Sequence, residues 1–375
     1  MGISTVKPVP PQANQIEITL IGPGYGESTL VHIGNDKWVI IDSCIDSATS
    51  EPAAISYLRS IGVNPEISVV LIIATHWHDD HVRGISKVLE SCPNAIFCAS
   101  SVLSKEEFLN YVLPFDEYNP IAAGSGIKEL KEMFRILCNK KRHKIGAIMN
   151  RRIYYIPASD TEPECSVWTL SPSDKQVDLF LNSLAELIPE VKTTKYRVVE
   201  PSDISNHLSI VTWIEVGDFA ILLGGDKRET KDYDTGWSVI IKSKERPQRR
   251  ACIYKVSHHG SSNAHNDGIW TEMLLSQPYA LLTTYNRGRR KLPTSADVSR
   301  IETFTGNGYS TSRLSTVKSK TRRSPAVEKT IKGKIRIRSI QPRTGMIRLR
   351  QTINELGSWS VELSDSACKL KEVHS

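Results

Sequence analysis

The chain has 375 residues, of which 39% are hydrophobic and 24% charged, values that are ordinary for a globular protein with a sizeable core. Its longest apolar run, residues 69–74, is far shorter than the roughly 20 residues of a membrane-spanning helix. Residues 287–350 hold 18 Lys and Arg against three acids, a net of +15, which leaves −8 for the rest because the whole chain carries +7. This asymmetry favours an anionic partner, although a solvated basic surface has the same composition.

The N-terminus predicts a protein that is not exported. Residues 1–15 contain prolines and no apolar stretch, so we expect a disordered leader and no signal peptide. The seven cysteines are scattered, odd in number and without a Cys-x-x-Cys pair. They predict neither a disulfide framework nor a zinc knuckle, and reduced thiols favour a cytoplasmic location.

The first hundred residues alternate short strands and helices. The pattern predicts strands at 16–20, 29–33, 37–42 and 67–74, and helices at 52–61 and 81–90. Residues 100–165 are less regular, and we interpret them as a helical and basic insertion with one helix at 126–138.

The second half returns to strands after a helix at 174–188. Strands are expected at 207–216, 219–223, 251–256 and 279–284, followed by a helix at 294–305. Residues 311–329 are rich in Ser, Thr, Lys and Arg and are predicted to be flexible, whereas 334–340 and 345–350 alternate like a short hairpin. This order predicts two layered sheets with helices outside, an α/β sandwich.

Three of the ten histidines fall within six residues, in His76-Trp77-His78-Asp79-Asp80-His81, directly after the most apolar strand. A loop at a strand end can turn several side chains toward one point. Imidazole nitrogens and a carboxylate are ligands that Zn²⁺ and similar ions prefer. The spacing therefore predicts a divalent-metal site, with Trp77 as a packing residue or pocket wall.

The pattern His-x-His-x-Asp-His resembles the metallo-β-lactamase superfamily, and further pieces follow in that family's order. Asp42 ends an early strand, Asp226 follows Leu-Leu-Gly-Gly after a hairpin, and His258-His259-Gly260-Ser261 follows a later strand. The resemblance implies an αββα sandwich over about residues 16–310, apart from the insertion, with a basic C-terminal extension at 311–375.

Two details are similar to one branch of that superfamily, the hydrolase domain attached to the bacterial competence DNA-uptake channel, ComEC. They are the His-His-Gly-Ser motif and the sequence Asn206-His207-Leu208-Ser209 before a strand, and residues 280–307 are similar too. The membrane segments of that channel are absent, so the resemblance implies a stand-alone relative.

The resemblance also implies roles for single residues. His76 and His78 would hold one ion, and Asp80, His81 and His258 a second, with Asp226 bridging both. The third ligand of the first ion would be His207, with Asn206 or water as alternatives. We favour His258 over His259 as a ligand because it lies nearer the strand end, so that His259 would support it or protonate a leaving group. Asp42 would orient the metal loop.

The function implied is that of a binuclear metal-dependent hydrolase, in which Asp80 orients a hydroxide held between two divalent ions, Zn²⁺ or alternatively Mn²⁺. The branch resemblance and the basic segment favour a phosphodiesterase or nuclease acting on nucleic acid or another phosphoester. One alternative is a small-molecule hydrolase for a cyclic nucleotide, lactone or thioester. Another is a metal-binding component of a multiprotein phage-defence system, with partner proteins and without a membrane.

Overall fold

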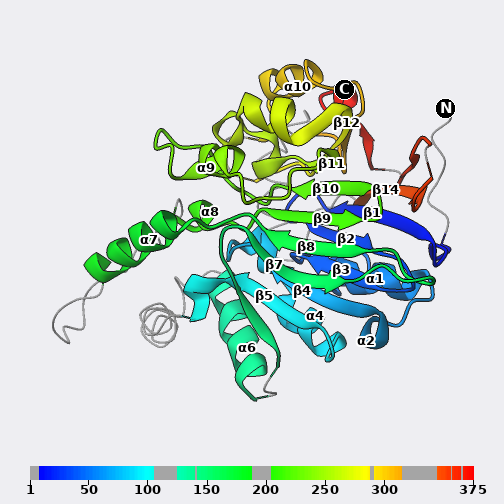
Figure 1. Ribbon diagram of the computed structural model, residues 1–375, viewed down its shortest axis with the longest axis horizontal. Coiled ribbons are helices and arrows are strands. Elements are labelled where there is room, and N and C mark those ends of the chain that lie inside the picture. The colour runs from blue at the N-terminus through cyan, green and yellow to red at the C-terminus, as the bar shows by residue number, and fades with distance from the viewer. Residues whose placement is uncertain are drawn as a thin grey trace, which may run out of the picture.

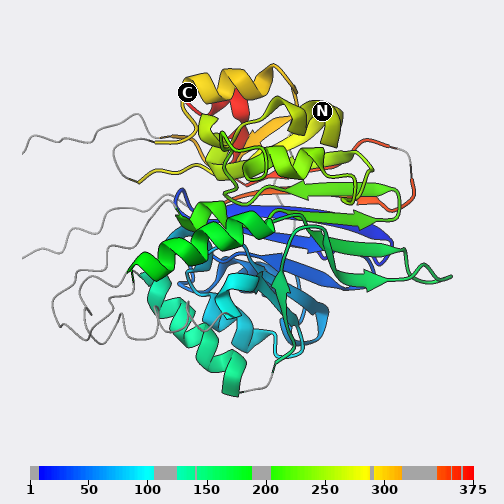
Figure 2. The ribbon, with the colours of Figure 1, turned by 60° about the vertical axis from the view of Figure 1, so that its left-hand side comes forward.

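The computed structural model describes residues 8–104, 125–139, 142–187, 204–287, 291–314, 344–355, 357–364 and 366–375. Two eight-stranded sheets lie face to face, and helices cover the outer face of each (Figures 1 and 2). The expected αββα sandwich is therefore confirmed. The first residues of the predicted leader, most of the predicted flexible segment and the predicted strand 334–340 lie outside the described residues.

The first sheet has the strand order β15-β14-β1-β2-β3-β4-β5-β6. The bounds are β1 Gln15–Gly22, β2 Ser28–His32, β3 Trp38–Ile41, β4 Val69–Ala74, β5 Ile96–Ser100, β6 Lys144–Ala147, β14 Gly345–Thr352 and β15 Ser360–Leu363. Strands β3 to β6 run parallel to one another, whereas β1, β2, β14 and β15 pair antiparallel.

The second sheet has the order β16-β13-β12-β11-β10-β9-β8-β7. The bounds are β7 Arg151–Ile156, β8 Cys165–Thr169, β9 Thr212–Val216, β10 Phe219–Leu223, β11 Ala251–Lys255, β12 Leu274–Leu282, β13 Gly308–Ser310 and β16 Cys368–Lys369. Here β10 to β13 are parallel, so their carboxyl ends meet at one edge of the sheet.

Helices flank the sheets. Their bounds are α1 Ala53–Ser60, α2 Pro65–Ser68, α3 Asp79–Val82, α4 Ile85–Ser91, α6 Ser125–Asn139, α7 Asp174–Leu187, α8 Ile204–His207, α9 Gly236–Lys242 and α10 Ser295–Glu302, with a π-helical turn η4 at Ile269–Met273. Helices α1, α4 and α6 pack on the first sheet, and α9, α10 and η4 pack on the second. Among these helices none is both long and apolar enough to cross a membrane.

The central strand β4 shows why its sequence is apolar throughout. Leu71 and Ile73 point into the layer between the sheets, while Val69 and Ile72 point into the helix layer. A strand with both faces buried reads as a continuous apolar run rather than an alternating one. The predicted strand at 67–74 is shortened by α2, whose first turn is capped by the Asn64 side chain.

Three segments are arranged differently from the sequence reading. Within 100–165, which we interpreted as an insertion, β6 extends the first sheet, and β7 and the start of β8 belong to the second. The predicted strand 207–216 begins with the helical turn α8 and pairs only from Thr212. Near the C-terminus, β14 pairs along the whole of β1, and β16 pairs with β13. The seven cysteines are all free.

Candidate metal centre

The chemistry-bearing residues lie where strands of both sheets end. In the first sheet, Asp42 follows β3 and the histidine loop follows β4. In the second sheet, Asp226 follows β10, and His258 and His259 follow β11. Because neighbouring parallel strands bring their carboxyl ends together, each sheet delivers its residues to one edge. The two edges meet, so the site lies between the sheets.

Two glycines shape the turn before Asp226. Gly224 accepts no side chain, since a Cβ there would stand 2.0 Å from the Ser257 hydroxyl. Gly225 has a left-handed backbone, φ +52°, and its carbonyl accepts from His258 N–H at 3.1 Å and from the Lys255 ammonium at 3.1 Å. These bonds hold the ends of β10 and β11 together and fix Asp226 relative to the two histidines.

His258 and His259 both adopt positive φ, at 48° and 53°. This conformation is uncommon for residues with a Cβ, and it is often retained at functional sites because the surrounding structure holds it. Its consequence is that the adjacent imidazoles reach the same carboxylate from different sides. The distance from Nε2 to Asp226 Oδ2 is 4.0 Å for His258 and 3.9 Å for His259.

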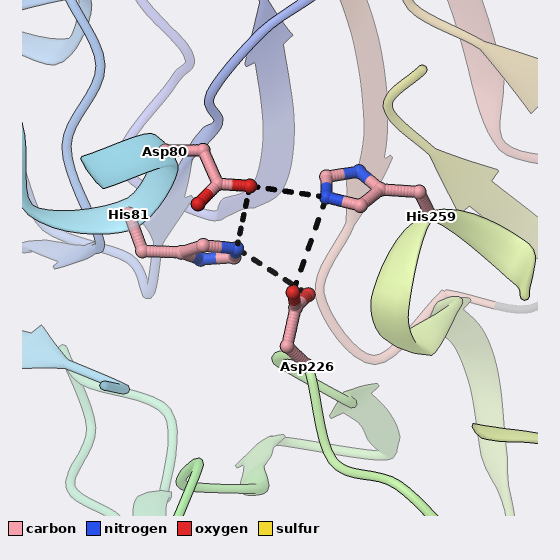
Figure 3. A group of neighbouring side chains, drawn as sticks. All are labelled: Asp80, His81, Asp226 and His259. Atoms are coloured by element: carbon pink, nitrogen blue, oxygen red, sulfur yellow. Dashed lines mark hydrogen bonds and ion pairs between the residues drawn. The ribbon is translucent and has the colours of Figure 1, made fainter. Parts of the chain in front are cut away.

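Four buried side chains form one compact group, Asp80, His81, Asp226 and His259 (Figure 3). His259 Nε2 lies 3.3 Å from Asp80 Oδ2, and His81 Nε2 lies 3.3 Å from Asp226 Oδ1. The remaining contacts, His81 to Asp80 and His259 to Asp226, are 3.9 Å. The structure thus brings His259, rather than the favoured His258, into the group with Asp80 and His81.

The other end of the cluster is looser. His76 Nε2 lies 3.9 Å from Asp226 Oδ2, and the His78 ring meets the His76 ring at 4.8 Å between centroids. His258 faces the same Asp226 oxygen and is the most exposed of the imidazoles around it, at 13% of its side-chain surface. Asp226 lies between this end and the four-residue group.

Asn206 and His207 have different places relative to the cluster. With its amide oriented to satisfy both sides, the Asn206 NH₂ donates to His76 Nε2 at 3.2 Å and to His78 Nδ1 at 3.1 Å. Its oxygen accepts two hydrogen bonds from the Arg228 guanidinium, at 3.1 and 2.8 Å. His207 is in neither metal-type group found among the described residues, and its backbone carbonyl accepts from the Lys227 ammonium. Asn206 therefore occupies the place beside His76 and His78 that we expected His207 to fill.

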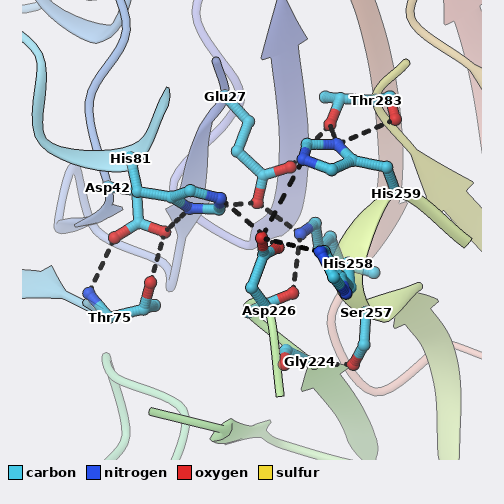
Figure 4. A network of polar contacts seen from close by, with 12 residues as sticks. Glu27, Asp42, Thr75, His81, Gly224, Asp226, Ser257, His258, His259 and Thr283 are labelled. Carbon is cyan, nitrogen blue, oxygen red and sulfur yellow. Dashed lines mark hydrogen bonds and ion pairs between the residues drawn. The ribbon is translucent and has the colours of Figure 1, made fainter. Parts of the chain in front are cut away.

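Most of these histidines use Nδ1 for support and present Nε2 to the cluster (Figure 4). His81 Nδ1 bonds Asp42 at 2.7 Å, and Asp42 in turn accepts from Thr75 N–H and its hydroxyl, both at 2.7 Å. His259 Nδ1 lies 3.1 Å from the Thr283 hydroxyl, and His258 Nδ1 lies 2.9 Å from the Asn263 amide oxygen. Such bonds fix the imidazole orientation and leave the other nitrogen as an electron-pair donor.

The buried charges do not balance within the protein. Glu27, Asp42, Asp80 and Asp226 are buried together, and Lys255 is the buried ammonium among them, paired with Glu27. Burial disfavours an imidazolium, but the carboxylates of Asp226, Glu27 and Asp42 outweigh burial and raise the pKa of His81 well above its usual value. The cluster therefore attracts positive charge, as a cation site does.

The donor set fits divalent ions. His81 Nε2 and Asp226 Oδ1 are buried and make no hydrogen bond among the described residues. Metal bonds of about 2.0–2.2 Å at tetrahedral angles place two ligand atoms about 3.4 Å apart. The 3.3 Å separations in the four-residue group match this value, so Asp80, His81, Asp226 and His259 suit one ion. His76 and His258 lie 3.9 and 4.0 Å from the other oxygen of Asp226, which makes these two imidazoles candidates for holding a second ion, with His78 beside His76.

A comparison with protein families agrees with this geometry. Residues 21–106 match the family described as the Metallo-beta-lactamase superfamily, and they include Asp42 and the whole histidine loop. The N-terminal part of the chain therefore matches this superfamily. The matched segment supplies one sheet's share of the site, and Asp226 and the two later histidines complete it from the other sheet. No curated protein sequence matches the chain.

Solved structures that are similar to this chain include the metallo-beta-lactamase fold protein YhfI from Bacillus subtilis. It is 12% identical, with 64% of this chain and 70% of that chain covered and a TM-score of 0.30. The Rm3 metallo-beta-lactamase is 13% identical over 69% of this chain and 81% of that chain, with a TM-score of 0.33. A metallo-beta-lactamase from Cronobacter sakazakii is 11% identical over 63% of this chain and 73% of that chain, with a TM-score of 0.33.

The sequence reading missed several residues that support the site. Glu27 follows the glycine-rich turn at 22–26, Lys255 ends the strand before His-His-Gly-Ser, and Thr283 ends β12. A charged residue at the end of an apolar strand is the signal that marks Lys255. Nothing local marks Thr283, whose hydroxyl donates to Glu27 at 2.6 Å from 256 residues away.

Proposed function

We propose that this protein is a two-metal phosphodiesterase that cleaves nucleic acid. Its superfamily is one of metal-dependent hydrolases, and the cluster of imidazoles and carboxylates suits two divalent ions. The observation that favours a phosphoester is the Arg228 guanidinium, which holds Asn206 against His76 and His78. A permanent cation at this end of the cluster suits a substrate that carries negative charge at the reacting group.

When bound, divalent ions would supply an activated water and polarise the phosphorus–oxygen bond. The chain's own residues set where this happens. Asp80 and His259 hold one end of the cluster, with the Thr283 hydroxyl behind the imidazole. Asp42 holds His81 from the far side through Nδ1. Arg228 adds positive charge at this end of the cluster, which favours a phosphate ester there.

The basic segment at 287–350 contributes to this proposal only in part. Twelve of its 18 Lys and Arg lie outside the described residues. Among the others, Arg348 and Arg350 are in ion pairs with Glu362 and Glu17, which join β14 to its neighbouring strands. These two arginines stabilise the first sheet. We therefore expect the other basic residues of the segment to contact the nucleic-acid backbone.

The test is cleavage by protein reconstituted with Zn²⁺ or, separately, Mn²⁺. Labelled single- and double-stranded DNA and RNA are the substrates, and bound metal is measured by mass spectrometry. We expect the parent to cleave a polymer and the His78→Ala/Asp80→Ala variant to lose both metal and cleavage. His143→Ala is the matched control, since His143 is exposed and distant in sequence from the cluster residues.

An uncleaved polymer in the presence of bound metal would contradict the nuclease proposal. Activity on bis-p-nitrophenyl phosphate or a cyclic nucleotide would then favour the small-molecule alternative. Metal binding without any ester cleavage would favour the proposal that the protein serves with partners in a phage-defence system.

A further inference from the structure

Two tyrosines and an arginine form a wall next to the four-residue group. The Tyr285 ring lies 5.3 Å from the His259 ring, and the Tyr25 ring lies 5.7 Å from that of Tyr285, measured between centroids. The Arg287 guanidinium carbon lies 3.5 Å from the centre of the Tyr25 ring. Both rings are partly exposed and Arg287 is exposed, so this wall faces solvent as well as the cluster.

The wall is built on two loops that are joined by backbone bonds. Tyr25 lies in the turn between β1 and β2, whereas Tyr285 and Arg287 follow β12. The Asn286 N–H donates to the Gly24 carbonyl at 2.9 Å, which links the loops. Tyr285 and Leu292 exchange two backbone hydrogen bonds, at 2.9 and 3.0 Å, which close the second loop. The rings are thus held in position without a ligand.

The first loop is also tied to the metal loop. The Glu27 N–H donates to the Asp80 carbonyl at 2.9 Å, and the backbone of Gly26 packs against Asp80. Burial, together with the Asp80 and Asp79 carboxylates, raises the pKa of Tyr25 to about 12, and burial and Asp80 raise that of Tyr285. Both tyrosines therefore stay neutral at physiological pH and keep their hydroxyl protons.

The two tyrosine rings lie beside the metal cluster and are only partly buried. A ligand with a flat apolar surface would cover them and gain stacking contacts. A nucleobase stacks on a tyrosine ring or on a guanidinium plane, and stacking of this kind is tolerant of base identity. The guanidinium also pairs with a phosphate oxygen. Because the guanidinium already covers one face of Tyr25, a base would stack on the Tyr285 ring or on the outer side of the guanidinium, while the edge of the guanidinium pairs with the phosphate.

We propose that Tyr25, Tyr285 and Arg287 form a nucleotide subsite that stacks a base and binds a phosphate next to the metal centre. This inference rests on the proposed phosphodiesterase function and narrows its substrate. A base that is paired and stacked inside a duplex is unavailable to the rings. The preferred substrate is therefore a single-stranded nucleic acid or a short oligonucleotide.

The test compares two phosphomonoesters, adenosine 5′-monophosphate and ribose 5-phosphate, which share the phosphate and differ in the base. Binding to the metal-loaded protein is measured by calorimetry. We expect the parent to bind adenosine monophosphate about 5- to 150-fold more tightly, which corresponds to the roughly 1–3 kcal/mol of one stacked base. Tyr285→Ala and Tyr25→Ala should remove this preference, while Tyr285→Phe and Tyr25→Phe should keep it.

Arg287→Ala separates the roles further. Arg287 is exposed, so its replacement cannot unfold the core. The substitution should weaken the binding of both ligands by a similar factor, because both carry the phosphate. Equal binding of the two ligands by the parent would overturn the subsite, and so would a preference that survives both Ala variants. Metal content measured alongside excludes an indirect effect through the cluster.

Polymer cleavage is measured in parallel so that the two proposals can fail separately. A parent that cleaves single and double strands equally, with no base preference in binding, refutes the subsite and leaves the phosphodiesterase. A parent that cleaves no polymer but keeps a tyrosine-dependent preference for the base supports the subsite and refutes the nuclease.

Discussion

The buried pair of Lys255 and Glu27 provides a sharp test of how the site is held. Lys255→Met removes the ammonium and keeps the length of the side chain. The side chains of the pair are 2% and 3% exposed, and the ammonium also donates to the Gly225 carbonyl at 3.1 Å. The substitution leaves the Glu27 carboxylate beside the other buried acids. Within the described part of the chain, the Thr283 hydroxyl donates to it at 2.6 Å, and His81 Nδ1 lies 3.6 Å away.

We expect a large loss in the free energy of unfolding. The reason is that burying an unpaired charge is more unfavourable than the original ion pair was favourable. Removing one partner of a buried ion pair typically destabilises a protein by about 3–5 kcal/mol. This is a large part of the roughly 5–15 kcal/mol by which domains are stable. The Glu27→Gln change should relieve the unpaired charge, so the double variant should lose less than the sum of the single variants.

The assay is urea unfolding of the four proteins of this double-mutant cycle, with chelator present so that bound metal does not contribute. Lys37→Met is the matched control, since Lys37 forms a partly exposed pair with Glu162 and should cost about 1 kcal/mol or less. An unchanged midpoint for Lys255→Met, or a double variant as unstable as the sum, would refute the reasoning.

Three further predictions concern single residues. Gly225→Ala should lower the free energy of unfolding by more than about 2 kcal/mol, since its Cβ would meet a hydroxyl at 2.6 Å and a carbonyl at 2.8 Å. The control is Gly62→Ala, because Gly62 is left-handed at φ +80° but has open space around it, and this change should cost about 1 kcal/mol. Equal losses in the two variants would contradict the clash. Burial lowers the pKa of His32 from 6.5 to about 4, so its neutral form stabilises the fold above pH 6.5 and about 3 kcal/mol is lost as the pH falls toward 4; urea midpoints of the parent should fall more steeply over this range than those of His32→Gln, and parallel curves would disprove the assignment. His259→Ala should release the ion held by the four-residue group while His258→Ala retains it, as metal stoichiometry would show, and the reverse result would restore the sequence-based preference.

The histidine loop was predictable because its information is local. An apolar strand buried on both faces followed by His-x-His-x-Asp-His predicts both the element and the donor set. The same holds for Asp226, which comes after a hairpin signal and two glycines. In each case the strand before these residues fixes where their side chains emerge.

The choice between His258 and His259 was not predictable from position in the chain. Distance from the strand end favoured His258, but the left-handed backbone at both residues turns His259 toward Asp80. The residue types do not predict this conformation, because positive φ is uncommon for any residue with a Cβ, even though histidine adopts it more often than most. The same limit applies to Asn206, whose place beside His76 depends on a guanidinium 22 residues further along the chain.

The strand predicted at 345–350 as half of a short hairpin shows why the site also needs distant residues, because its partner here is β1. β14 pairs with β1 over eight residue pairs, and the turn that carries Tyr25 and Glu27 starts where β1 ends. Glu27 then reaches Lys255 and Thr283 on the second sheet, and Asp80 reaches His259 there. A cation held by Asp80, His81, Asp226 and His259 would therefore bond to side chains from both sheets. The carboxylates that would attract the ion and the contacts that join the sheets come from the same few side chains, so neither sheet alone can form the site.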